Sequence, residues 1–115
     1  MPRDVSTPAG VRAVTAVAPA KINLHLGVGD LRADGFHDLL TVYRAVDLWE
    51  QVTVAFVDGD DPDDDDDDDV VVVSGPGADQ VPTDRTNLAA RAVDLLRSEA
   101  GSDARLLIRI VKGVP

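Results

Sequence analysis

Apolar and polar residues alternate along the first part of the chain, which predicts two strands. Residues 11–17 favour one strand and residues 20–26 a second, because Pro19 is expected to end the first. The second strand has the cleaner alternation, with Ile22, Leu24 and Leu26 on one face. Its other face carries the polar residues Lys21, Asn23 and His25.

The middle of the chain reads as a loop followed by short strands. Residues 27–37 contain Gly27, Gly29 and the dipeptide Asp34-Gly35, which favour turns. Residues 39–46 and 51–57 are rich in β-branched and aromatic residues, and we expect them to form an antiparallel hairpin around residues 47–50. A third short strand is expected at residues 70–74.

The last third of the chain predicts one helix and one strand. Pro82-Thr83-Asp84 leads into a helical pattern that places Leu88, Ala92, Leu95 and Leu96 on one face. Gly101 is well placed to end this helix. Residues 105–111 return to a period of two. The order indicates an α+β fold with a mostly antiparallel sheet and one main helix, in a single domain.

The charge of the chain is concentrated in one segment. Residues 58–69 hold ten of the 21 acidic residues, and the 11 Lys and Arg residues cancel the other 11, so this segment accounts for the net charge of −10. We expect this segment to be a solvated acidic loop, because like charges repel and it has nothing apolar to bury. Its spacing does not match a Ca²⁺ or Mg²⁺ ligand loop, and we predict no metal site. An acidic segment on a neutral body disfavours nucleic acid and anionic membranes as partners.

Three further features of the sequence limit the class of protein to which the chain can belong. Without cysteine the chain has neither disulfides nor thiolate metal sites. Residues 1–10 are expected to be a flexible leader, and they lack the apolar run of a signal peptide. The longest strongly apolar run is residues 70–73, far below the roughly 20 residues that cross a bilayer. These features favour a soluble cytoplasmic protein, and they leave its oligomeric state open.

Two segments carry the most specific chemical signal. Pro19-Ala20-Lys21-Ile22-Asn23-Leu24 is followed by Arg32-Ala33-Asp34-Gly35-Phe36-His37. Together they resemble the GHMP kinases, and within that superfamily the kinases that act on 4-diphosphocytidyl-2-C-methyl-D-erythritol. The resemblance runs from about residue 14 to the end of the chain. It implies an amino-terminal, ribosomal protein S5 domain 2-like fold, present only in part.

The resemblance also implies an activity and its cofactors. The γ-phosphoryl group of ATP, with Mg²⁺, would be transferred to the 2-hydroxyl of the cytidine-diphosphate-linked methylerythritol in non-mevalonate isoprenoid biosynthesis. Such a transfer depends mainly on positioning and on charge neutralisation. The small-molecule substrate would be the main partner of the protein.

The resemblance assigns roles to residues of both motifs. Lys21 matches a lysine beside the acceptor hydroxyl and is the candidate catalytic residue. Asn23 would hold a polyol hydroxyl, Phe36 would stack on the cytosine ring where the family commonly has tyrosine, and His37 would contact the base. On the residues alone, Lys21 also fits a solvated strand lysine, and Phe36 also fits an anchor for its own loop.

Three later residues match the nucleotide-binding region of the family. Asn87 and Leu88 resemble a segment that borders the adenine pocket, and Lys112 matches a lysine near the nucleotide. Asn87 fits a helix N-cap equally well, and Lys112 fits a solvated lysine at a strand end.

The glycine-rich phosphate loop and the catalytic aspartate of the family have no counterpart in the 115 residues. We therefore expect these residues alone to be inactive in phosphoryl transfer. Two alternatives stay open at this point. One is a different GHMP kinase, acting on homoserine or a sugar. The other is a non-enzymatic module whose acidic segment binds basic partners or cations.

Overall fold

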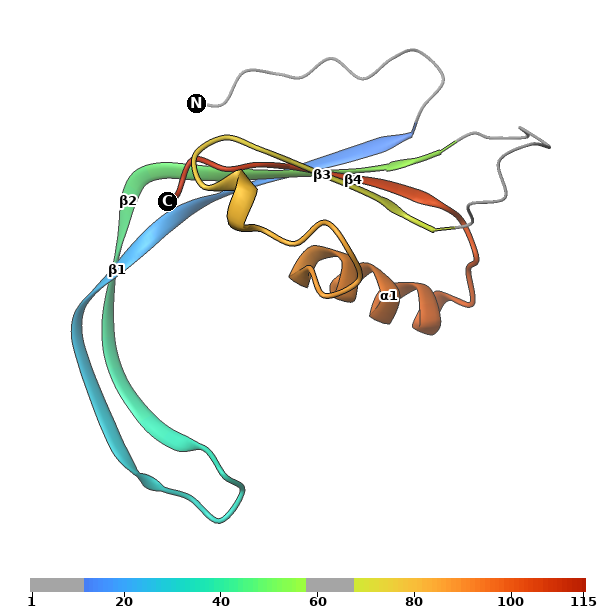
Figure 1. Cartoon of the computed structure of the whole chain (residues 1–115). Helices are drawn as coiled ribbons and strands as arrows, with labels where there is room; N and C mark the ends of the chain where they lie inside the picture. The colour runs from blue at the N-terminus through green and yellow to red at the C-terminus, as the bar shows by residue number, and fades with distance from the viewer. Residues whose placement is uncertain (1–11, 58–67) are drawn as a thin grey trace. The chain divides into compact units, whose positions relative to one another are not determined.

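The computed structural model describes residues 12–57 and 68–115. The expected leader at residues 1–10 and most of the expected acidic loop, residues 58–67, lie outside the described residues. The elements follow in the order β1 (Ala13–Leu31), β2 (His37–Phe56), β3 (Val70–Ser74), the short 3₁₀ helix η1 (Ala78–Gln80), α1 (Leu88–Ala100) and β4 (Leu106–Val111). The expected α+β class therefore holds (Figure 1).

The four strands form one mixed sheet in the order β1-β2-β4-β3. β4 pairs antiparallel with β2, for example Val54 opposite Ile108, and parallel with β3, for example Val71 opposite Ile108. β1 lies at an edge of the sheet. The expectation that Pro19 ends a strand is wrong, because β1 runs through it. An edge strand tolerates proline, since it needs hydrogen bonds along only one side.

β2 corrects a second expectation, because residues 39–46 and 51–57 belong to one strand of 20 residues. No Gly, Pro or Asn occurs between Asp38 and Val57, and Asp47 is the one turn-favouring residue near the expected bend, which does not suffice to interrupt the strand. The expected loop at residues 27–37 is also shorter. Residues 27–31 continue β1, and the turn occupies residues 32–36. The actual hairpin is therefore β1–β2.

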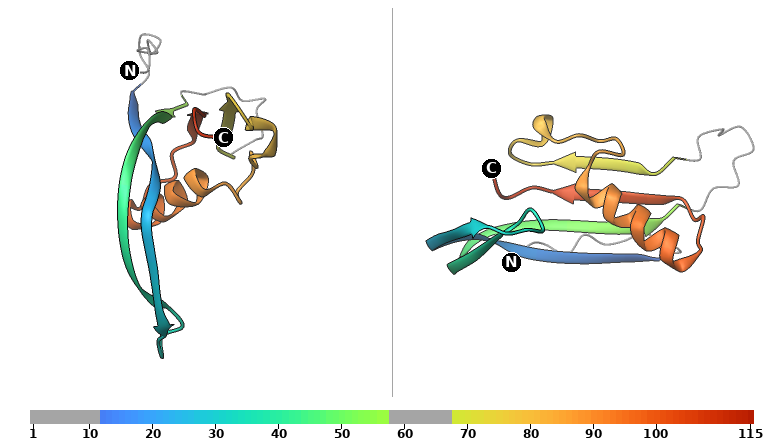
Figure 2. Two further views of the ribbon diagram at one scale, coloured as in Figure 1. Left: turned by 90° about the vertical axis from the view of Figure 1, so that its left-hand side faces the viewer. Right: turned by 90° about the horizontal axis from the view of Figure 1, so that it is seen from below.

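The helix α1 is capped by Asn87 at its N-terminus and by Gly101 at its C-terminus. The side chain of Asn87 accepts hydrogen bonds from the amides of Ala89 and Ala90, and Gly101 takes a left-handed conformation (φ 62°) at the other end. Figure 2 shows the helix running along one face of the sheet. The predicted leucine face is not the buried one: Leu88, Leu95 and Leu96 are 70–78% exposed.

The buried side of α1 is built from small and charged residues. Ala90 is 4% exposed, and Arg97 donates to both carboxylate oxygens of Asp69 at 2.7 and 2.8 Å. Asp69 also accepts from the amide of Leu106 at 2.8 Å, so it joins the helix to the start of β4. Its side chain is only 14% exposed. The last residue of the acidic segment thus has a structural partner, which differs from the solvated role expected for it.

The chain separates into two compact units. The first comprises residues 1–18 and 49–115, and the second is the β1–β2 hairpin at residues 19–48. Among the described residues, the buried apolar side chains are Ala55, Ala90 and Ile108, all in the first unit. Of the helices in residues 12–57 and 68–115, none has the length and apolar character needed to cross a membrane.

Candidate functional site

Lys21, on β1, lies in a small cluster within the hairpin unit. Its ammonium donates to Oδ1 of Asn23 at 3.3 Å and lies 5.2 Å from the centre of the Tyr43 ring. Lys21 and Asn23 share a face of the strand because they are two residues apart, and Tyr43 reaches them from β2. A cation above an aromatic face is attracted by the ring quadrupole. The structure therefore brings together the predicted Lys21 and Asn23 and adds Tyr43.

The turn between β1 and β2 is held by a network centred on Asp34. Oδ1 of Asp34 accepts from the amide of Phe36 at 3.1 Å, and Oδ2 pairs with the guanidinium of Arg32. Arg32 also donates to Asp38 at 2.9 Å. Gly35 has a positive φ of 83°, a conformation that glycine adopts without strain. The second sequence motif, residues 32–37, is therefore a structured turn.

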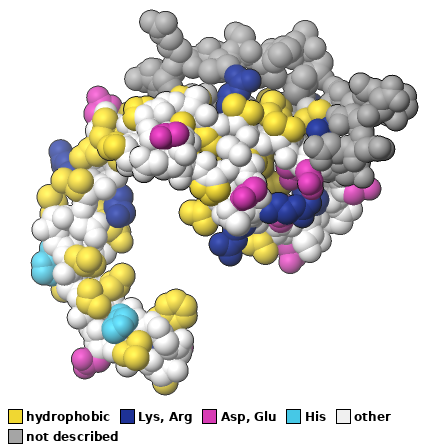
Figure 3. All heavy atoms as spheres, in the orientation of Figure 1, with side chains coloured by type: hydrophobic (Ala, Val, Ile, Leu, Met, Phe, Trp, Pro, Cys, Tyr) yellow, Lys and Arg dark blue, Asp and Glu magenta, His cyan; other side chains and the backbone are white. Residues whose placement is uncertain are grey.

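The turn presents the two residues predicted to meet the substrate base. Phe36 is 71% exposed, so its ring is open to solvent. Nδ1 of His37 lies 2.8 Å from the carbonyl oxygen of Gly29, across the hairpin. Figure 3 shows apolar side chains at the surface all along this hairpin. Phe36 and His37 are adjacent in the chain and lie in the same unit as Lys21, although no direct contact joins them to it.

Asn87 lies in the other unit, and most of its side-chain hydrogen-bonding capacity is used. Oδ1 accepts from Ala89 and Ala90 at 2.9 and 3.4 Å, and Nδ2 donates to the carbonyl oxygen of Pro82 at 2.8 Å. The residue is 4% exposed. The structure thus confirms the N-cap interpretation of Asn87. The neighbouring Leu88 is 78% exposed.

Lys112, directly after β4, forms an ion pair with Glu50 of β2 at 2.8 Å. The two side chains are 18% and 28% exposed, so the pair is partly shielded from water. Lys112 is therefore not a freely solvated strand-end lysine. An ammonium has three donor hydrogens, so the pair with Glu50 leaves donors for a second anion.

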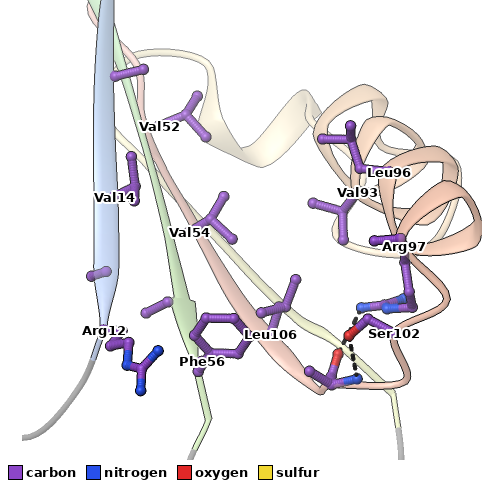
Figure 4. Close-up of a pocket in the computed structure, with 15 residues that line it drawn as sticks. Arg12, Val14, Val52, Val54, Phe56, Val93, Leu96, Arg97, Ser102 and Leu106 are labelled. Carbon is purple, nitrogen blue, oxygen red and sulfur yellow. Dashed lines mark hydrogen bonds between the residues drawn. The ribbon is translucent and has the colours of Figure 1, made fainter.

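A groove of about 800 Å³ in the described part of the chain contains none of the predicted site residues. Figure 4 shows it between the sheet, represented by Val52, Val54 and Leu106, and the helix residues Val93 and Leu96. Its lining is mostly apolar. Its polar members are Arg12, Arg97 and Ser102, and Arg97 is already paired with Asp69 and Asp94.

A smaller cavity of about 460 Å³ is lined mainly by charged and hydroxyl side chains, several of which pair with one another. Arg85 pairs with Asp68 at 2.5 Å, and its hydrogen bond and charge lower the pKa of Asp68. Hydrogen bonds from the Thr86 side chain and amide lower the pKa of Asp84. Within residues 12–57 and 68–115, no three His, Asp or Glu side chains gather into a possible metal site.

Sequence reasoning missed Tyr43, Glu50 and the structural role of Arg32 and Asp34. Arg32 and Asp34 stood inside the quoted motif, so their spacing before Phe36 was the available signal. Tyr43 and Glu50 depend on which residues face each other across strands, and the single sequence carried no sign of either contact.

Comparison with protein families found no family model that matches the chain. Curated relatives do match. A 4-diphosphocytidyl-2-C-methyl-D-erythritol kinase of Corynebacterium diphtheriae is 45% identical over 110 residues, covering 90% of this chain and 35% of the relative. The kinase of that name from Kineococcus radiotolerans is 46% identical over 108 residues (94% and 31%), and that from Mycobacterium tuberculosis is 41% identical over 102 (89% and 29%).

Solved structures give the same relationship. A crystal structure of 4-(cytidine 5′-diphospho)-2C-methyl-D-erythritol kinase matches with a TM-score of 0.57 and 30% identity, over 89% of this chain and 32% of that protein. Mevalonate diphosphate decarboxylase from Staphylococcus aureus matches with a TM-score of 0.56 at 18% identity, which supports the shared fold alone. The resemblance predicted from the two motifs and the expected fold class are confirmed. The chain spans about a third of the length of these relatives.

Proposed function

We propose that this chain, which is homologous to part of the GHMP kinases, forms the part of a 4-diphosphocytidyl-2-C-methyl-D-erythritol kinase that binds the phosphate acceptor. The reaction would transfer the γ-phosphoryl group of ATP to the 2-hydroxyl of the substrate, in isoprenoid biosynthesis. The observation that carries the proposal is the 41–46% identity to kinases of this name over about 90% of the chain.

In this proposal Lys21 is the catalytic cation. Phosphoryl transfer spreads negative charge over the transferred group, and an ammonium held at a fixed point stabilises that charge. The contacts of Lys21 with Asn23 and with the Tyr43 ring support the assignment, because they limit where its ammonium can lie. Asn23 keeps its amide N–H groups for a substrate hydroxyl, since only its oxygen is used by Lys21.

Phe36 and His37 would bind the cytidine end of the substrate. The exposed ring of Phe36 offers a surface for base stacking, and an aromatic ring stacked on a base contributes roughly 1–3 kcal/mol. His37, fixed through Nδ1, leaves Nε2 for the base edge. The hairpin unit thus carries all the residues that we assign to the substrate.

We further propose that Asn87, Leu88 and Lys112 border the ATP site. Leu88 offers exposed apolar surface to an adenine ring, and Lys112 can donate to a phosphate while it keeps Glu50. One N–H of the Asn87 amide is not used by the contacts described above. No described cluster of carboxylates fits Mg²⁺, so we assign it no residue of this chain. The phosphoryl transfer itself would need parts of the kinase beyond the third that this chain spans.

Calorimetric titration with cytidine diphosphate tests the proposal. We expect Phe36→Leu to weaken binding about tenfold, which corresponds to the lower part of the stacking range. Leu40→Ala is the matched control, because Leu40 is also 71% exposed on the hairpin. Equal affinities of both variants and the unmodified chain would contradict the assignment. A different GHMP kinase would be indicated if homoserine or a sugar bound and cytidine diphosphate did not.

A further inference from the structure

We propose that Asp34 is a positioning residue, which together with Arg32 holds the turn at residues 32–36 so that Phe36 and His37 meet a pyrimidine in a preset arrangement. The inference rests on the proposed function, because the pyrimidine is the ligand assigned there. It assigns a role to two residues that do not themselves touch the base.

The carboxylate of Asp34 joins the two sides of the turn. One oxygen accepts from the Phe36 amide at 3.1 Å, and the other pairs with Arg32, which directly follows β1. Arg32 in turn donates to Asp38 on β2 at 2.9 Å. The Asp34 and Arg32 side chains together therefore link the backbone of Phe36 to the start of β2.

Backbone hydrogen bonds close the same turn. The amide of Arg32 donates to the carbonyl of Phe36 at 2.7 Å, and the amide of Gly35 donates to the carbonyl of Arg32 at 3.0 Å. The ring of His37 is fixed to Gly29 at 2.8 Å. The backbone on both sides of Phe36 is thus restrained before any ligand arrives.

These restraints matter because packing does not hold Phe36. With 71% of its surface exposed, the direction of its ring depends on its backbone. A turn that is ordered in advance reduces the entropy lost when the ligand binds. The Asp34 carboxylate therefore contributes to affinity through Phe36, without contacting the ligand.

The two contacts of Asp34 contribute unequally to the stability of the turn. Its ion pair with Arg32 is half exposed, with side-chain exposures of 47% and 51%, and such pairs contribute little. The hydrogen bond to the Phe36 amide is retained by asparagine, which forms the same kind of turn. Asp34→Asn should therefore behave almost like the unmodified chain, whereas Asp34→Ala should not.

The experiment measures amide exchange by NMR and the Kd of cytidine diphosphate on the full 115-residue chain. We expect Asp34→Ala to speed exchange of the Phe36 amide about tenfold and to raise the Kd about fivefold, as the loss of one hydrogen bond implies. For Asp34→Asn we expect both values within about twofold of the unmodified chain. Asp30→Ala is the control, since Asp30 is an exposed aspartate of β1 outside this network.

Gly35→Ala perturbs the turn by an independent route. A methyl group at Gly35 meets nothing within 4 Å, but the φ of 83° is unfavourable for alanine. We expect the same pair of changes as for Asp34→Ala, so the inference stays testable if Asp34→Ala fails to fold. Exchange of the Ile108 amide, in the other unit, reports whether each variant is folded.

The outcomes separate the two proposals. If the unmodified chain binds and neither Asp34→Ala nor Gly35→Ala changes the Kd, the positioning role is wrong and the proposed function stands. If these variants loosen the turn but leave the Kd unchanged, the role is also wrong. If cytidine diphosphate does not shift Phe36 or His37 resonances in the unmodified chain, both proposals fail together.

Discussion

Replacing the N-cap residue Asn87 by alanine should destabilise the first unit strongly. Asn87 is 4% exposed, and its side chain makes hydrogen bonds at both ends. Loss of a cap costs about 0.5–2 kcal/mol. The carbonyl of Pro82 also loses its donor, which adds about 1 kcal/mol. We therefore expect the free energy of unfolding to fall by about 1.5–3 kcal/mol in total.

Urea unfolding followed by the circular dichroism of the helix measures this change. Asn87→Asp keeps the cap acceptor but cannot donate to Pro82, so about 1 kcal/mol of loss is expected. Leu88→Ala, next in the chain and 78% exposed, is the control and should change stability by less than about 0.5 kcal/mol. A loss below about 0.5 kcal/mol for Asn87→Ala would refute the cap as an important stabilising contact.

Three further predictions concern single contacts. Asp69→Ala should lower the free energy of unfolding by about 2–3 kcal/mol in urea titrations, because the half-buried Arg97 loses one of its two charged partners and the Leu106 amide loses its acceptor; no loss would contradict this. Thr86→Val should raise the pKa of Asp84 toward its ordinary value in an NMR titration. Because that pKa is lowered by folding, its stabilising contribution is present at neutral pH and is lost as the pH falls through the folded-state pKa; an unchanged pKa would count against the contact. Tyr43→Leu should abolish the ring-current shift of the Lys21 Cε protons, Tyr43→Phe should keep it, and equal shifts in both would exclude the cation–π contact.

Local sequence signals predicted the elements whose ends are marked by residues with special chemistry. Asn87 and Gly101 cap α1 at the expected positions, and the strand at residues 105–111 appears as Leu106–Val111. Here the side chain or the conformational freedom of one residue decides where the element ends. The two-part motif likewise predicted Lys21 beside Asn23, because alternation along one strand fixes their common face.

Features set by neighbouring strands could not be read from one sequence. Pro19 is accommodated because β1 lies at the edge of the sheet. Arg97 faces the sheet because Asp69, 28 residues earlier in the chain, accepts its hydrogen bonds. The Tyr43 contact with Lys21 depends in the same way on the pairing of β1 with β2.

The most direct test of the account is where a cytidine nucleotide lies on the chain. Intermolecular nuclear Overhauser effects between the cytosine H5 and H6 protons and the protein would locate it. We predict contacts with the ring protons of Phe36 and with His37, in the hairpin at residues 19–48. Contacts confined to Val54, Val93 and Leu96, in the apolar groove of the other unit, would contradict the proposed substrate site.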